Sequence, residues 1–129
     1  MVNVCSSYES GRNGERESVE YLRKKGYAII ERNYRAKGGE IDIIARVGDT
    51  LVFVEVKSRS SSRFGYPEEA VGMAKRRRIA RVMRAYLYAH TISPETYIRF
   101  DIISLQLSAG ASGDVFTHLQ NCDIGEDVF

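Results

Sequence analysis

The segment Leu51–Val56 reads LVFVEV, so its apolar side chains lie on both faces of an extended strand. Side chains alternate between the two faces of a strand, and a strand that is apolar on both is typical of a sheet covered on both sides. This pattern favours a central strand between two layers of helices, which is an α/β fold. The 129 residues are about one domain's length, enough for one hydrophobic core.

Glycine-containing turns divide the rest of the chain into helices and strands. Gly26 suits the end of a helix, and the turns at 37–39 and 48–49 link three short β-rich segments into an antiparallel meander. The predicted fold is a central mixed β-sheet flanked by helices, in the order αβββαβ(β). The predicted elements are a helix over 15–25, strands over 27–35, 40–47 and 50–58, a helix over 67–88, and strands over 97–107 and 115–119.

Charge is distributed unevenly along the chain. Residues 101–129 hold five acids and no lysine or arginine, which leaves all 19 basic residues and 12 of the 17 acids in residues 1–100. A basic body indicates a polyanionic partner, nucleic acid first, although ordinary solubility charge explains the balance equally well. We expect one domain over residues 1–129, with a flexible N-terminus (1–8) and a flexible acidic C-terminal tail (120–129).

Two neighbouring predicted strands each carry a carboxylate in an apolar setting. Asp42 lies within IDIIA, on the predicted face of Glu40 and Ile44, where a carboxylate is costly unless it is paired or binds a metal. Glu55 and Lys57 share one face at the end of the next strand. An acid–lysine pair alone is common at strand ends, but Asp42 at hairpin distance makes a functional site as probable as a structural one.

The two helices add further candidates. Glu15 lies on the stripe of its helix that faces the sheet, and Lys75 lies on the buried stripe of the second helix. A salt bridge or cap explains Glu15 equally well, and Lys75 can extend from the edge of the core to solvent. Carboxylates such as Asp42, Glu55 and Glu15 are ligands for Mg²⁺ or Mn²⁺ rather than for a softer metal. Such an ion supports phosphodiester hydrolysis, with Lys57 placed to orient the attacking water.

A run of basic residues without neighbouring acids follows in the second helix. Ordinary solvated helices pair such charges with acids four residues away, so phosphate contact is the better interpretation. The serine-rich loop after Lys57 supplies two more arginines that can grip a nucleic-acid backbone. The residues predicted to bind nucleic acid are Arg59, Arg63, Lys75, Arg76, Arg77, Arg81 and Arg84.

The remaining polar candidates are interpreted structurally. Asp101 lies in an apolar strand and is predicted to pair with an arginine. His90 and His118 show no metal-ligand spacing, and Cys5 and Cys122 have no activating neighbour in sequence. We therefore assign no chemistry to these histidines and cysteines.

Asp42 followed by Glu55-Val56-Lys57 resembles the PD-(D/E)xK nuclease signature. The wider pattern resembles the bacterial YraN-like family over residues 8 to 122, although Ser18 stands where we expect alanine. No proline precedes Asp42, which departs from the wider nuclease signature but is shared by the YraN-like pattern. That family is similar to archaeal Holliday-junction resolvases, which implies a restriction-endonuclease-like fold with Asp42, Glu55 and Lys57 as the catalytic core and Glu15 as an additional acid. The motifs that carry the resemblance include GRxGE at 11–15, RNYR at 32–35, GEID at 39–42, FVEVK at 53–57, PEEAV at 67–71 and RFD at 99–101.

The sequence therefore predicts a cytoplasmic, Mg²⁺- or Mn²⁺-dependent endonuclease acting on DNA, whether branched or single-stranded. Metal would be held by Asp42, Glu55 and Glu15. A homodimer would supply the two active sites needed to cut a junction symmetrically. No partner membrane is expected, because no apolar run in the sequence is long enough to span one. Two alternatives stay open: a non-catalytic nucleic-acid-binding module on the same scaffold, and an adaptor whose acidic tail binds a protein.

Overall fold

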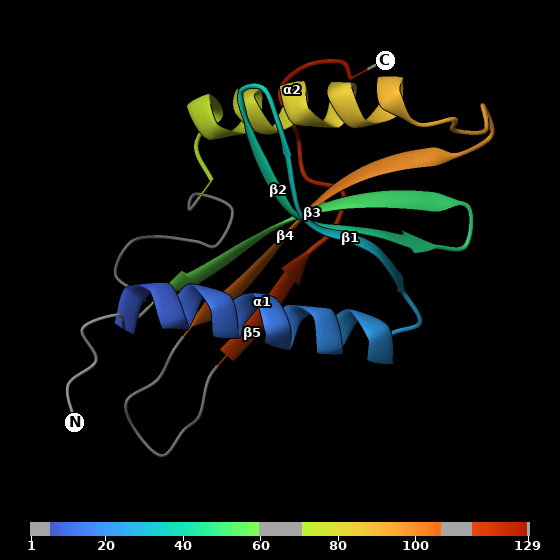
Figure 1. The fold of residues 1–129 in the computed structure, drawn as a ribbon. Coiled ribbons are helices and arrows are strands. Elements are labelled where there is room, and N and C mark those ends of the chain that lie inside the picture. Colours follow the sequence, from blue (N-terminus) through green and yellow to red (C-terminus); the bar gives the residue numbers. More distant parts are fainter. Residues whose placement is uncertain (1–5, 60–70, 107–114, 129) are drawn as a thin grey trace.

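The computed structural model describes residues 6–59, 71–106 and 115–128. One mixed β-sheet lies between two helices, one on each face (Figure 1). Within the described residues, no helix is both long enough and apolar enough to cross a membrane. The elements are α1 (Ser6–Lys24), β1 (Ala28–Ala36), β2 (Gly39–Val47), β3 (Thr50–Arg59), α2 (Met73–Ala89), β4 (Tyr97–Gln106) and β5 (Val115–Leu119).

The five strands lie in sequence order, and only one neighbouring pair is parallel. β1, β2 and β3 form the predicted antiparallel meander, β3 runs parallel to β4, and β5 pairs antiparallel with β4. The parallel step needs a crossover, which contains α2. The predicted α/β class and the predicted order αβββαβ(β) are confirmed, with the fifth strand present.

The sheet separates two apolar clusters, as the two-faced apolar pattern of β3 predicted. Leu51 and Phe53 of β3 pack beneath α2, whereas Val52 and Val54 pack beneath α1. All four side chains are essentially inaccessible to solvent. Burying an aliphatic or aromatic side chain of this kind contributes about 1.5–3 kcal/mol relative to leaving it exposed. The central strand is therefore held from both sides.

Helix α1 begins at Ser6, nine residues earlier than the sequence predicted. Glycines such as Gly14 are poor helix formers, so local propensity does not favour a helix before Glu15. Gly14 is nevertheless helical, and a Cβ at this position would collide with the Ser58 hydroxyl of β3. The absent side chain lets α1 lie against the end of β3, so close packing overrides helix propensity.

Helix α2 begins at Met73, six residues later than predicted. Gly72 is its N-cap, in extended conformation, and Val71 before it is buried in the cluster beneath α2. The predicted first turn at Pro67 lies outside the described residues. The helix ends at Ala89, one residue from the predicted end.

Strand β2 departs from regular alternation at Asp42. Its ladder with β3 ends at the pair Ile43–Val54, and Ile41 packs beneath α2 together with Ile44. The sequence placed Ile41 on the opposite face, with Ile43, so that prediction was wrong. The strands part beyond Ile43, and a strand that leaves its ladder can turn its side chains to the other face.

Three apolar side chains of the acidic C-terminal segment 120–128 pack against the fold, a contact that the sequence did not predict. Cys122, Ile124 and Val128 lie against the cluster beneath α2, and the Cys122 amide donates a hydrogen bond to the Phe100 carbonyl. Charges add to this packing, because Arg84 of α2 lies 2.6 Å from the Glu126 carboxylate. Apolar anchoring and ion pairing together hold this segment along α2.

Candidate functional site

The side chain of Asp42 occupies the point where β2 and β3 part. Its Oδ2 accepts a hydrogen bond from the Val56 amide at 2.8 Å. In a continuous ladder a backbone carbonyl would satisfy that amide, so the carboxylate replaces a strand partner. The hairpin of β2 and β3 therefore brings Asp42 next to Glu55, and the sequence predicted this proximity.

Glu55 is almost completely buried, with its side chain 4% exposed, and it interacts directly with Asp42. Burial raises the pKa of Asp42 to about 8, the charges of Glu55 and Glu15 add to the rise, and the Val56 hydrogen bond opposes it. Two carboxylates brought together away from water cannot both stay ionised without a compensating cation. The pair therefore has the electrostatic character of a proton-sharing or cation-binding site.

Lys75 supplies a cation to this pair from the first turn of α2. Its Nζ lies 2.7 Å from Glu55 Oε2. Burial alone would lower the pKa of Lys75, but the ion pair with Glu55 outweighs burial and raises the pKa, so the ammonium stays charged. The sequence placed Lys75 among the nucleic-acid contacts, whereas here it is bound to the acid pair.

Glu15 is the predicted third acid, and its carboxylate is hydrogen-bonded to the side-chain amide of Asn33. Its Oε1 accepts a hydrogen bond of 2.9 Å from Asn33 Nδ2. Across the three described stretches of chain, no group of three or more His, Cys, Asp or Glu side chains is placed to hold a metal ion. Glu15 thus influences Asp42 electrostatically without joining Asp42 and Glu55 in a ready-made three-acid site.

The acid pair still fits a hard divalent cation. Mg²⁺ is commonly bound by one or two carboxylates, with water and substrate phosphate completing its coordination. Asp42 and Glu55 supply that number, and their mutual repulsion in a buried setting favours a cation between them. The donors are all oxygen, which suits Mg²⁺ or Mn²⁺ rather than zinc.

The predicted lysine of β3 has no hydrogen-bond or ion-pair partner among the residues that the structure describes. Lys57 is half-buried and pairs across the parallel ladder with Ser104. Arg59 ends β3, whereas Arg63 lies outside the described residues. Lys57 is therefore placed two residues from Glu55 along β3, as the alternation predicted.

The four arginines of α2 that were predicted to bind nucleic acid divide into two groups. Arg76 donates to the Val71 and Asp123 carbonyls, and Arg84 pairs with Glu126. Arg77 and Arg81 are exposed and, within the described part of the chain, form no ion pair. Of the five predicted nucleic-acid contacts on α2, Arg77 and Arg81 present open cationic side chains. The acidic C-terminal segment engages Arg76 and Arg84, and Glu55 binds Lys75.

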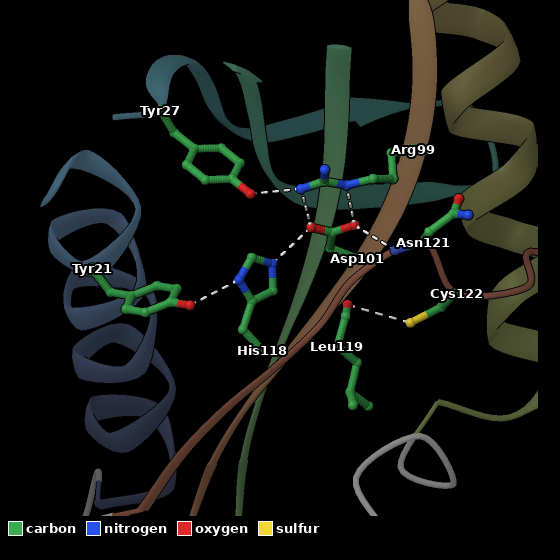
Figure 2. Close-up of polar contacts among 8 residues, drawn as sticks. All are labelled: Tyr21, Tyr27, Arg99, Asp101, His118, Leu119, Asn121 and Cys122. Atoms are coloured by element: carbon green, nitrogen blue, oxygen red, sulfur yellow. Dashed lines mark hydrogen bonds and ion pairs between the residues drawn. The ribbon is translucent and has the colours of Figure 1, made fainter. Parts of the chain in front are cut away.

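On the opposite face of the sheet, a buried polar network joins β4, β5 and α1 (Figure 2). Asp101 is completely buried, and both its oxygens accept from Arg99 at 2.9 Å. This confirms the predicted arginine partner. His118 Nε2 lies 2.7 Å from Asp101 Oδ2, and the Asn121 amide donates to the other oxygen. The sequence assigned no chemistry to His118, because residues 17 apart give no signal before β4 and β5 pair.

The network is consistent in its proton arrangement. An ionised Asp101 can only accept, so His118 Nε2 carries the proton, and in the neutral ring Nδ1 accepts from the Tyr21 hydroxyl at 2.9 Å. Burial by itself would raise the pKa of Asp101, but hydrogen bonds from His118, Arg99 and the Asn121 amide outweigh it and lower the pKa. The network faces α1 whereas Glu55 faces α2, so the network and the acid pair lie on opposite faces of the sheet. We therefore interpret the network as structural.

Comparison with known proteins gives one consistent family. A family model described as "Uncharacterised protein family UPF0102" matches residues 14–105. Similar proteins include a UPF0102 protein of Caldicellulosiruptor saccharolyticus, 46% identical over 100 residues that cover 78% of this chain and 84% of that one. A UPF0102 protein of Clostridioides difficile is 50% identical over 99 residues, covering 77% of this chain and 86% of the relative.

A solved structure of Pyrococcus furiosus SfsA, in complex with Ca²⁺, is also similar to this chain. The two share 14% sequence identity with a TM-score of 0.42, and the match covers 81% of this chain. This chain spans 61% of the length of that protein. A likeness at this level has no bearing on the chemistry of the acid pair.

Proposed function

The chain belongs to the uncharacterised protein family UPF0102, the YraN-like family that its motifs indicated, and from the geometry of its acid pair we propose that it is a metal-dependent endonuclease. The proposed reaction is hydrolysis of phosphodiester bonds in DNA, whether branched or single-stranded. The observation that carries the proposal is the pair Asp42–Glu55 where β2 and β3 part, with Asp42 half-buried and Glu55 buried. Lys75 neutralises only one of these two acids, whereas purely structural acids in such a place are normally each paired with a base.

In this proposal Asp42 and Glu55 hold Mg²⁺ or Mn²⁺, and Glu15 adds negative charge at the rim. The bound ion would polarise a phosphoryl oxygen and lower the pKa of a water molecule. Lys57, on the same strand as Glu55, holds that water and neutralises charge that develops on the phosphate. Lys75 holds the Glu55 carboxylate in position through their ion pair, in which Nζ lies 2.7 Å from Oε2.

Titration of the metal alone tests the site. We expect Mn²⁺ or Mg²⁺ to bind wild-type protein saturably by calorimetry and to show no saturable binding to the double variant Asp42→Ala/Glu55→Ala. The control is Asp49→Ala, which removes an exposed acid of the β2–β3 turn and should leave binding unchanged. If no binding appears, the titration is repeated with an uncleavable DNA analogue present. Absence of an Asp42-dependent heat in both series would contradict the proposed metal site.

The exposed arginines of α2 supply the nucleic-acid contact in this proposal. Arg77 and Arg81 lie four residues apart on the solvent face of the helix, with Tyr88 further along it. Such a row can follow a phosphate backbone without reading bases. Arg59 and Arg63 follow Lys57 in sequence and would hold the strand on the other side of the scissile phosphate.

Removing this pair of charges should weaken binding in a salt-dependent manner. For Arg77→Gln/Arg81→Gln we expect weaker binding to duplex and junction DNA, with the slope of log affinity against log salt reduced by about two. Fluorescence anisotropy across a salt series measures both quantities. The matched control is Arg23→Gln/Lys24→Gln on α1, across the sheet from α2. Equal losses in the two double variants would show that only net charge matters and that α2 is not the interface.

The ion pair of Lys75 with Glu55 favours a second candidate function. Because Lys75 already neutralises Glu55, the site can persist without a metal, as in a non-catalytic nucleic-acid-binding module. That function predicts DNA binding that Asp42→Asn leaves unchanged or strengthens, with no cleavage by either protein. The cleavage assay described in the Discussion separates the two functions.

A further inference from the structure

Asn33 occupies an unusual backbone position inside strand β1. Its φ is 52°, and within the described residues the other non-glycine residue with a positive φ is Asn121. Asparagine tolerates this left-handed conformation better than most residues, but the conformation still costs about 1 kcal/mol or more. The β1–β2 register also shifts nearby, between Ile29 and Glu31. Strained backbone of this kind tends to persist where a side chain must be aimed.

The side chain of Asn33 joins two carboxylates from different elements. Its Nδ2 donates to Glu15 Oε1 of α1 at 2.9 Å and to Glu40 Oε2 of β2 at 3.0 Å. An amide nitrogen has two hydrogens, and these contacts use both of them. Two carboxylates are thus brought to one neutral donor. Asn33 thereby links α1, β1 and β2 at one point.

That point adjoins the proposed metal site. Glu40 precedes Asp42 by two residues on β2, and the charge of Glu15 acts on Asp42. The other oxygen of Glu40 lies 3.6 Å from Arg35 Nε, so Glu40 is held from a second direction. Glu15 has only the Asn33 amide as a hydrogen-bond partner among the described residues. The position of the Glu15 carboxylate therefore depends on Asn33.

We infer that Asn33 is a positioning residue whose amide holds the Glu15 carboxylate at the rim of the Asp42–Glu55 metal site. The inference rests on the proposed function. If Asn33 served only to tolerate the positive φ, Asn33→Gly would leave metal binding unchanged, because glycine adopts a positive φ without strain. Asn33→Gly keeps or improves backbone stability while deleting the amide. Stability and metal binding are therefore expected to separate in this variant.

The experiment measures Mn²⁺ affinity by calorimetry and thermal unfolding without metal. For Asn33→Gly we expect Mn²⁺ binding weakened about 10- to 100-fold, as for other residues that orient metal ligands, with an unchanged or higher Tm. The matched control is Asn121→Gly, because Asn121 has nearly the same φ as Asn33. The substitution keeps the backbone N–H that donates a hydrogen bond to Asp101. It should bind Mn²⁺ as wild type does. Asn33→Asp keeps the side-chain size but loses the donor, so it should lose at least as much affinity.

A double-variant cycle shows whether Asn33 acts through Glu15. We expect Glu15→Gln to weaken Mn²⁺ binding comparably, and Asn33→Gly/Glu15→Gln to bind no more weakly than either single variant. Additive losses, or wild-type affinity in Asn33→Gly, would overturn the positioning role while leaving the metal site in place. Wild-type protein that binds no Mn²⁺, alone or with uncleavable DNA, would overturn the proposed function itself and this role with it.

Discussion

Asp42→Asn is expected to lower the rate of DNA cleavage by at least about 100-fold, because it removes a charged oxygen from the acid pair that binds the cation. The substitution preserves shape and leaves the side-chain carbonyl able to accept from the Val56 amide, which the native carboxylate accepts at 2.8 Å. The measurement is single-turnover cleavage of four-way junction, linear duplex and single-stranded DNA with Mg²⁺ or Mn²⁺. Binding of DNA should persist, so the loss belongs to the chemical step.

The control for this prediction is Asp49→Asn, which changes an exposed acid in the turn between the same two strands. It should cleave as wild type does. Cleavage that survives Asp42→Asn at the wild-type rate would assign the activity to a contaminant or to another site. If neither protein cuts any substrate while both bind DNA with the expected salt dependence, the non-catalytic module becomes the better description.

Asp101→Asn is expected to lower the free energy of unfolding by about 3–5 kcal/mol at neutral pH. Asp101 is completely buried, and the substitution leaves Arg99, only 18% exposed, without its anionic partner. It also places an amide where His118 Nε2 and the Asn121 amide both donate. Urea unfolding at pH 7 measures the loss, with Asp49→Asn as the exposed control. A midpoint equal to that of wild type would show that the network is not essential to the fold.

The same pair of proteins gives a pH dependence of known sign. Hydrogen bonds lower the pKa of Asp101 in the folded protein, whereas an unfolded aspartate titrates near about 3.9. The stabilisation is therefore fully present above about pH 4 and is lost as the pH falls through the lower folded value. The groups facing the carboxylate are Arg99, His118 and, through Arg99, the Tyr27 hydroxyl. The difference between wild type and Asp101→Asn should shrink in acid and not in alkali.

Much of the fold could be predicted because its signals are local. The two-faced apolar pattern of Leu51–Val56 required cover on both sides, and the glycine turns fixed an antiparallel meander. The errors occurred where packing overrides local preference. Gly14 lies inside α1 because it packs against Ser58, and β2 turns its side chains where its ladder ends.

The candidate site was predictable only in part. Asp42 and Glu55 stood out because each is a carboxylate in an apolar strand, and a hairpin brings such strands together. Neither the ion pair of Lys75 with Glu55 nor the hydrogen bond from the Asn33 amide to Glu15 could be predicted. Both contacts join elements whose relative placement follows from helix packing. The contacts of the acidic C-terminal segment could not be predicted for the same reason, since its apolar residues have a partner only once α2 is in place.

The sequence by itself determined the α/β class, the order of the elements and the acids most worth testing, because alternation and turn chemistry act over a few residues. The tertiary structure alone decided which charges meet. In the folded protein Glu55 pairs with Lys75, and Glu15 accepts a hydrogen bond from Asn33. Asp101 pairs with both Arg99 and His118. Ion pairs and hydrogen bonds form only within about 3–4 Å, and residues far apart in sequence come that close only after the sheet and its helices have packed.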